Sequence, residues 1–138
     1  MKYRKLGRTG LIVSEVALGS MQFGRKMNMG NLGQEDTTRM VKQALDNGVN
    51  FIDTADVYSL GESETMLGNA LKGVREEIVL ATKVRLPMGE NFNRSGATRV
   101  NIMREVEGSL RRLQTRMPML WYSANDWNPC SMPRPTRL

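Results

Sequence analysis

The 138-residue chain contains no histidine and only one cysteine, Cys130. A single cysteine cannot form an internal disulfide, and without histidine the usual zinc-binding residue sets are missing. A Ser-His-Asp hydrolase site cannot be assembled either, because its general base is histidine. We therefore expect no metal centre and no hydrolase of that kind.

Long hydrophobic runs are also missing. No stretch approaches the roughly 18 consecutive apolar residues that a membrane span requires. The N-terminal segment MKYRKLGRTG has no apolar region after its basic residues, as a secretory signal would. With 40% hydrophobic and 25% charged residues, the composition is typical of a globular protein of about one domain. We expect a cytoplasmic protein with no membrane partner.

Aromatic residues make up only 6% of the chain, and its net charge of +6 comes from basic residues spread along the sequence. Nucleic-acid binding calls for a basic stripe or for aromatic side chains on which bases stack. Neither pattern is present, so we expect no nucleic-acid partner.

The pattern of apolar residues predicts alternating strands and helices. The segments YRKLG and LIVSE flank the turn RTG and predict a hairpin, and VALG predicts a brief strand. VNFID predicts another strand, and the continuous apolar run EIVLATKV predicts a strand covered on both faces. Apolar residues at helical spacing predict helices over 34–47, 62–71 and 98–113. The predicted order after the hairpin is strand, helix, strand, helix, strand, helix.

The third predicted helix has one apolar and one charged side. The apolar side, expected to face the core, comprises Ile102, Val106, Leu110 and Leu113. The side expected to face mainly water comprises Arg104, Glu107, Arg111 and Arg112.

Alternation of this kind predicts a parallel sheet with crossover helices, either an open doubly wound sheet or a closed eight-stranded barrel. The open dinucleotide-binding fold would have G-x-G-x-x-G in its first strand-to-helix turn, and the sequence has none there. In barrels, chemistry lies on the loops that follow the strands. Met21, Asp53, Tyr58 and Lys83 all fall at such strand ends.

Asp53, Tyr58 and Lys83 together have the composition of a general acid. An unperturbed tyrosine hydroxyl, with a pKa of about 10, is a poor proton donor at neutral pH. An adjacent ammonium favours the phenolate, and a carboxylate keeps that ammonium charged and oriented. Reduction of a carbonyl needs such a donor for its oxygen. Each residue taken singly also has a structural interpretation: a turn acid, a half-buried loop aromatic and a strand-end lysine.

The segment DTADVYSLGESE, preceded by GVNFI and followed by LGNAL and IVLATKV, resembles the aldo-keto reductase signature. The opening YRKLGRTGLIVSEVALGSMQFG resembles that superfamily's hairpin and first barrel strand. VNIMREVEGSLRRLQT is similar to the helix before its fourth strand. The resemblance extends from about residue 3 to residue 115.

The resemblance implies a (β/α)8 TIM barrel, a nicotinamide cofactor and reduction of an aldehyde or ketone. NADPH is the usual cofactor in this family, and NADH is the alternative. Asp53, Tyr58 and Lys83 match three of the family's four catalytic residues, with Tyr58 as the proton donor. Gly19, Ser20 and Met21 match the nicotinamide side of the pocket, and Asp53 also contacts the cofactor.

The fourth catalytic residue of the family is a histidine at the end of the fourth strand, which this chain lacks. SAND stands in its place, which puts Ser123, or Ala124 without a gap, at the histidine position. A serine hydroxyl donates a hydrogen bond but cannot become cationic. Pro118 interrupts the expected strand.

The sequence changes in character after about residue 115. Four of the five prolines, both tryptophans and Cys130 lie between residues 118 and 138. We expect the N-terminal half of a barrel over 1–115, with the hairpin and about four β/α units, and a divergent, disordered or non-native tail over 116–138. Truncation is favoured over a natural Pro-rich tail because complete barrels have about 250 residues. Unpaired barrel edges then favour self-association.

Two functions remain open from the sequence. One is an NAD(P)H-dependent reductase of a small carbonyl compound. The other is a catalytically impaired fragment or pseudoenzyme with at most weak cofactor or partner binding. The sequence does not identify the aldehyde or ketone.

Overall fold

The computed structural model describes residues 1–116 and 120–123. It opens with an antiparallel hairpin of β1 (Tyr3–Lys5) and β2 (Ile12–Ser14), as the sequence predicts. The side chain of Asn50 fastens this hairpin to the rest of the fold. Its Oδ1 accepts from the Ser14 N–H at 2.7 Å, and its Nδ2 donates to the Ile12 carbonyl at 3.1 Å.

Four parallel strands form the sheet behind the hairpin. They are β3 (Leu18–Gly19), β4 (Phe51–Asp53), β5 (Val79–Val84) and β6 (Leu120–Ser123), and they lie side by side in chain order. The connections contain α1 (Gln34–Asp46), α2 (Glu62–Ala70) and α3 (Arg99–Arg112), together with the short helices η1 (Lys26–Asn28), η2 (Tyr58–Gly61) and η3 (Arg75–Glu77). The predicted α/β alternation is therefore confirmed.

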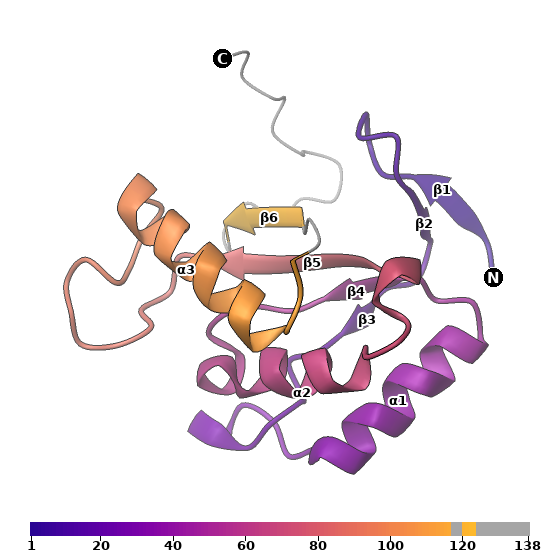
Figure 1. Cartoon of the computed structure of the whole chain (residues 1–138), viewed down its shortest axis with the longest axis horizontal. Coiled ribbons are helices and arrows are strands. Elements are labelled where there is room, and N and C mark those ends of the chain that lie inside the picture. Colours follow the sequence, from indigo (N-terminus) through magenta and orange to yellow (C-terminus); the bar gives the residue numbers. More distant parts are fainter. Residues whose placement is uncertain (117–119, 124–138) are drawn as a thin grey trace.

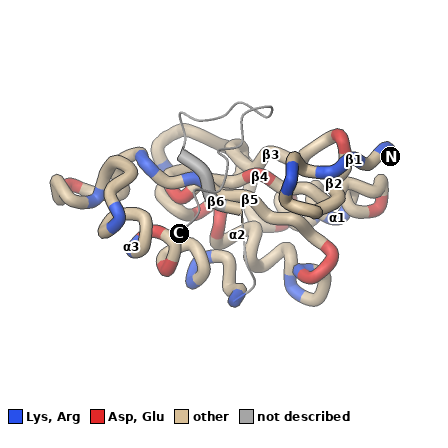
Figure 2. The backbone as a smooth tube through the Cα atoms, turned by 90° about the horizontal axis from the view of Figure 1, so that it is seen from above, with Lys and Arg blue, Asp and Glu red and all other residues tan. Residues whose placement is uncertain are grey.

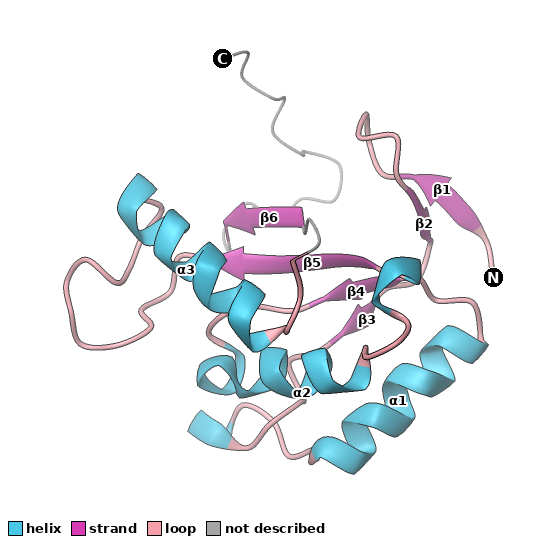
Figure 3. Ribbon diagram, in the orientation of Figure 1, coloured by secondary structure: helices cyan, strands magenta, loops and turns pink. Residues whose placement is uncertain are grey.

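The helices α1, α2 and α3 all lie on one face of the sheet (Figure 1). The hairpin lies beside the N-terminal ends of the strands, opposite the ends to which the strand arrows point (Figure 3). Parallel strands joined by right-handed crossovers produce this arrangement when every helix falls on the same side. Over the described ranges the sheet is open and does not close into a barrel.

Local sequence accounts for where the helices begin and end. Gly48 follows α1 with a φ of 82°, a left-handed conformation that glycine adopts without strain. Thr98 caps α3, because its side chain accepts a hydrogen bond from the Asn101 N–H at 3.2 Å.

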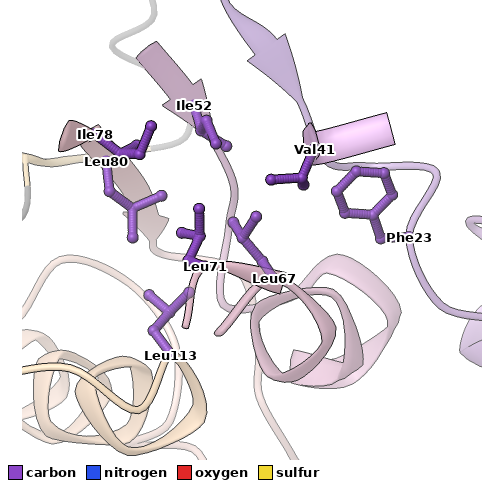
Figure 4. Close-up of a cluster of buried hydrophobic side chains, with 8 residues drawn as sticks. All are labelled: Phe23, Val41, Ile52, Leu67, Leu71, Ile78, Leu80 and Leu113. Carbon is purple, nitrogen blue, oxygen red and sulfur yellow. The ribbon is translucent and has the colours of Figure 1, made fainter. Parts of the chain in front are cut away.

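The main core lies between the sheet and the helices (Figure 4). Its buried members come from β4, β5, all three helical regions and the loop after β3: Phe23, Val41, Ile52, Leu67, Leu71, Ile78, Leu80 and Leu113. A smaller cluster on the opposite face contains Val13 of the hairpin with Phe51 and Ala81. Successive strand residues point to opposite faces, so Phe51 and Ile52 contribute to different clusters.

The buried side of α3 differs from the prediction except at Leu113, which lies in the core as expected. Asn101, Glu105 and Ser109 are fully or almost fully buried, whereas Ile102, Val106 and Leu110 are only half-buried. Arg112, expected to face water, has a side chain only 22% exposed and pairs with a buried glutamate of α2. The inward polar side supplies partners to that glutamate, and a buried charge is costly without them.

Strand β6 lies within the region predicted as a divergent tail, and it pairs with β5 along its whole length. The proposed boundary at residue 115 stays a prediction. Pro118 lies outside the described residues. Within the described part of the chain, no helix is long and apolar enough to span a membrane. Basic and acidic residues are interspersed along the described chain (Figure 2).

Candidate functional site

The predicted site residues meet at the C-terminal ends of β4 and β5. In the parallel register Asp53 is opposite Ala81, so Lys83 lies two residues further along β5 and on the same face as Asp53. A long lysine side chain bridges that offset. Two neighbouring strands thus bring an acid and an amine together from positions 30 residues apart in sequence.

Lys83 is the centre of a cluster that includes both other predicted catalytic residues. Its Nζ lies 2.5 Å from Asp53 Oδ2 and 3.1 Å from the Tyr58 hydroxyl oxygen. The third contact of the ammonium is the Thr54 carbonyl oxygen at 2.9 Å. An ammonium has three hydrogens and so can donate to all three of these oxygens. The ion pair is nearly enclosed, with side-chain exposures of 11% for Lys83 and 17% for Asp53.

This arrangement leaves the tyrosine hydrogen available. Because the ammonium donates to the phenolic oxygen, that oxygen acts as acceptor toward Lys83, and its own hydrogen can point elsewhere. The ammonium also lies 4.8 Å from the Tyr58 ring centroid. Positive charge beside a phenol stabilises the oxygen's negative charge after the hydrogen leaves. In this geometry the cation can stabilise the phenolic oxygen if its hydrogen is transferred.

The chain that follows Tyr58 is strained. Ser59, Leu60 and Gly61 have consecutive positive φ angles of 49°, 53° and 81°, which only glycine adopts at little cost. Backbone of this type persists where the surrounding structure imposes it and is concentrated at functional sites. Contacts do impose it here, since the Ser59 hydroxyl is buried and donates to the Phe23 carbonyl at 3.1 Å.

The three residues that the sequence predicts as cofactor contacts lie at the neighbouring end of β3: Gly19, Ser20 and Met21. Gly19 is the register partner of Asp53 and is exposed, and Met21 is 47% exposed. The Ser20 side chain is instead fully buried, where the Ser63 hydroxyl donates to its Oγ at 3.0 Å. Gly19 and Met21 therefore offer surface beside Asp53, while the Ser20 hydroxyl belongs to the interior.

The loop that contains Met21 is fixed to the start of α2. Glu62 Oε2 accepts from the Arg25 N–H at 2.9 Å and from the Lys26 N–H at 3.3 Å. These bonds hold the pKa of the Glu62 carboxyl below its ordinary value, and the bond from Arg25 has the larger effect. A Cβ added to Gly24 would come within 2.8 Å of the Ser59 side chain, so the two loops around the site pack closely.

Gly19 lies next to open space. A Cβ built on Gly19 meets nothing within 4 Å, so the packing of this chain does not require glycine there. Open space beside Asp53 and exposed Met21 is what a nicotinamide ring would need. No group of three or more Cys, Asp or Glu side chains suited to a metal ion occurs among residues 1–116 and 120–123.

A second ionic cluster, which sequence reasoning missed, lies behind the first. Glu64 of α2 is completely buried, and its Oε2 lies 2.6 Å from Arg112 Nε and accepts from the Ser109 hydroxyl at 3.1 Å. Its Oε1 accepts from the Thr82 hydroxyl at 2.7 Å. Glu105 lies close by, 4.0 Å from Arg112 Nη2. We call Glu64, Glu105, Arg112, Ser109 and Thr82 the inner cluster.

Asp56 joins the inner cluster from the loop that contains Tyr58. Its side chain is almost fully buried, and burial raises its pKa to about 7, with the nearby charges of Glu64 and Glu105 adding to the effect. The sequence offered one signal for the inner cluster: the acid of Ser63–Glu64 in the signature and the base Arg112. Nothing local in the sequence shows that these residues are buried together.

Ser123, one of the two residues expected at the family's histidine position, is the last residue of β6 and the register partner of Val84. It thus ends a strand beside the end of β5, next to the residue after Lys83. Ala124 lies outside the described residues.

Comparison with known proteins gives one consistent result. The model of the aldo/keto reductase family matches residues 15–133. An aldo-keto reductase of Bacillus subtilis, YhdN, is 38% identical over 117 residues, which cover 83% of this chain and 35% of that protein. Versiconal hemiacetal acetate reductase of Aspergillus parasiticus is 34% identical, with 87% of this chain and 41% of that protein covered.

Solved structures agree. The aldo-keto reductase AKR11C1 of Bacillus halodurans, described in its holo form, is 36% identical with a TM-score of 0.72, over 89% of this chain and 40% of that one. The chain thus spans well under half the length of these relatives. Matches of this extent and identity show that the chain belongs to the aldo/keto reductase family.

Proposed function

We propose that this chain reduces an aldehyde or ketone with a nicotinamide cofactor, and that Tyr58 donates the proton. The single observation that carries the proposal is the contact of Lys83 Nζ with both Asp53 Oδ2 and the Tyr58 oxygen. The family of the chain supports an oxidoreductase. Relatives named for reductase activity, such as the Aspergillus enzyme, support a carbonyl substrate.

Each residue has a defined part in this proposal. The cofactor, when bound, supplies the hydride. Gly19 and Met21 would form the surface against which it lies, with Asp53 at its edge. Tyr58 transfers its hydroxyl hydrogen to the carbonyl oxygen of the substrate as negative charge develops there. Lys83 stabilises the phenolate that is left, and Asp53 orients Lys83.

The chain has no histidine to place beside the carbonyl oxygen of the substrate. Ser123 ends the strand in that place, and a serine there would supply at most a hydrogen bond. We therefore propose a reductase with weaker orientation of the carbonyl group than an enzyme with histidine would have. NADPH and NADH are both to be tested, because no described residue discriminates between them.

We further propose that the fold corresponds to the first half of a (β/α)8 barrel. The four parallel strands support this, as does the coverage of only 35% to 41% of the length of the three relatives named above. Strands β3 and β6 are the outer strands of the described sheet, and unpaired strand edges favour self-association. Sedimentation velocity that finds only monomer over a range of concentrations would remove self-association from the proposal.

The function is tested by NADPH oxidation with an aromatic aldehyde. Tyr58→Phe should reduce turnover by about 100-fold or more, the lower range for loss of a general acid. Tyr3→Phe is the matched control, because Tyr3 also loses a hydroxyl but binds the Gly48 carbonyl on the hairpin side of the fold. Equal turnover in wild type and Tyr58→Phe would refute the role of Tyr58. No turnover in any protein would favour the impaired fragment.

A further inference from the structure

Asp56 connects the inner cluster with the proposed proton donor. It lies two residues before Tyr58, and its backbone N–H donates to the carbonyl of Lys83 at 3.2 Å. The Tyr58 N–H in turn donates to the Ala55 carbonyl at 3.3 Å, which closes a tight turn over residues 55–58. A displacement of Asp56 therefore moves the backbone that holds Tyr58 against Lys83.

The Asp56 carboxyl group occupies an unusual position. Asp56 is only 1% exposed. Its Oδ2 atom has no hydrogen-bond partner among the described residues. The other bond of the group is local, from the Val57 N–H. A buried carboxylate with an unsatisfied oxygen is costly, whereas the protonated acid carries no charge in the same place.

The groups around Asp56 make its charge harder to accommodate. Glu64 approaches from α2, and Glu105 from α3, and both add negative charge. Arg112 of α3 is the cation that faces this carboxyl group. It is shared, however, since it lies 2.6 Å from Glu64 and 4.0 Å from Glu105.

Two further cations lie near the cluster, but each is paired with an acid other than Asp56. Arg94, in the loop after β5, lies 3.5 Å from Glu105 Oε1. Lys83 of β5 presents its ammonium to Asp53 on the opposite face of the sheet. A third carboxylate charge at Asp56 would therefore be repelled by two acids that already share the nearby arginine.

We propose that Asp56 is a positioning residue: in its neutral form it allows the turn over residues 55–58 to pack against the inner cluster and hold the Tyr58 hydroxyl beside Lys83, and its ionisation loosens that turn. The proposal rests on the proposed function for its effect on catalysis. Its structural part, the coupling of the Asp56 charge to the place of Tyr58, does not require turnover. The pKa of Asp56, raised to about 7, would bring this change within the ordinary working range of pH.

The structural part is tested without cofactor or substrate. Wild-type protein is labelled with ¹³C in the tyrosine rings and in the aspartate carboxyl groups and titrated from pH 5 to pH 9, with Tyr58 assigned by Tyr58→Phe and Asp56 by Asp56→Asn. We expect the Asp56 carboxyl signal and the Tyr58 ring signal to change with one common midpoint near pH 7. The step at Tyr58 should be lost in Asp56→Asn. A Tyr58 signal that stays constant while Asp56 titrates would overturn the proposal.

The catalytic part is tested by the pH profile of kcat for NADPH-dependent aldehyde reduction. In wild type we expect kcat to fall by at least about tenfold as pH rises through 7, since a 1 Å displacement of reacting groups costs on the order of 100-fold. Asp56→Asn, whose side chain stays neutral, should keep the low-pH kcat without this fall. The control is Asp46→Asn, which changes an exposed acid at the end of α1 and should keep the wild-type profile.

The possible results separate the two proposals. The same midpoint of kcat in wild type and Asp56→Asn would overturn the positioning role. A Tyr58 step that depends on Asp56, in a chain without turnover, would refute the reductase while it supports the coupling. If Asp56→Asn does not fold, the wild-type titration still decides, because the Tyr58 ring signal is assigned by Tyr58→Phe, and a Tyr58 signal that stays constant through pH 7 would contradict the coupling.

Discussion

Strand β5 separates two ionic clusters of different character. Lys83 faces the proposed site, where its partner Asp53 is 17% exposed, and Thr82 faces the helices, where its partner Glu64 is completely buried. Adjacent strand residues point to opposite faces, so one step along the chain moves from one cluster to the other. We call Asp53, Tyr58 and Lys83 the outer cluster. The loop after β4 repeats this division, with Tyr58 in the outer cluster and Asp56 in the inner one.

The two clusters contain similar side chains but differ in their access to solvent. The outer cluster holds the Tyr58 hydroxyl beside the Lys83 ammonium, and open space lies at Gly19, the register partner of Asp53. The inner cluster satisfies a buried carboxylate and holds α2 to α3 and β5, which fixes the backbone behind the site. Substitutions in the inner cluster should therefore change stability most, and substitutions in the outer cluster should change chemistry.

The largest expected effect on stability comes from Arg112→Met. Removal of this guanidinium leaves the Glu64 carboxylate buried without its cation, which typically costs about 3–5 kcal/mol. Urea unfolding measures the loss. Arg111→Met is the control, since the Arg111 side chain is 72% exposed and its removal should change stability by about 0.5 kcal/mol or less. Equal losses in both variants would show that the inner cluster does not stabilise the fold.

The next effect is a pH dependence of stability. Because the pKa of Asp56 rises from its ordinary value of 3.8 to about 7 on folding, the folded chain keeps a proton that the unfolded chain releases between these values. The stability that this retained proton contributes is therefore complete below about pH 4 and is lost as pH rises to about 7. The slope has a maximum of about 1.4 kcal/mol per pH unit.

Urea unfolding at a series of pH values compares wild type with Asp56→Asn. The variant should lack this part of the slope, and Asp46→Asn should keep it. Parallel curves for wild type and Asp56→Asn would mean that Asp56 is ionised at ordinary pH in the folded chain.

A smaller loss is expected for Gly68→Ala. An added Cβ at this position of α2 would lie 2.7 Å from the backbone carbon of Leu113, which follows α3. Backbone cannot yield as a flexible side chain does, so we expect a loss of about 1–3 kcal/mol, measured by thermal or urea unfolding. Unchanged stability would show that α2 and the end of α3 pack less closely than the structure indicates.

Gly19→Ala should have the smallest effect on stability, within about 0.5 kcal/mol, because the added methyl group meets nothing within 4 Å. The same methyl group would occupy the space proposed for the nicotinamide ring. We expect weaker NADPH binding, measured by fluorescence titration, in a chain as stable as wild type. Unchanged affinity would move the cofactor away from Gly19.

The sequence predicted the outer cluster because its members follow strands within a local motif. Asp53 and Tyr58 are five residues apart, and parallel strands place Lys83 beside them. The inner cluster was not predictable in the same way, because Glu64 and Arg112 are 48 residues apart and each belongs to a helix of mixed polarity. Arg111 and Arg112 are the same residue type in adjacent positions, and only the packing of α3 distinguishes the exposed one from the paired one.

The same reason explains the error at α3. The apolar Ile102, Val106 and Leu110 predicted the core side, but these residues are only half-buried. Ser109 and Arg112 point inward instead, where both donate hydrogen bonds to Glu64. The order of strands and helices was predicted well, since hydrophobic periodicity and turn residues act locally. The placement of polar side chains depends on partners distant in sequence.

The central claim is that a phenol held by an ammonium completes the reduction of a carbonyl group. Its most direct test is mass spectrometry of the alcohol formed from an aromatic aldehyde and NADPH that bears deuterium at the transferred position. Wild type should yield alcohol with one deuterium on the former carbonyl carbon. The amount of this alcohol should be smaller by about 100-fold or more with identically purified Tyr58→Phe. Equal amounts of deuterated alcohol from both proteins would contradict the account.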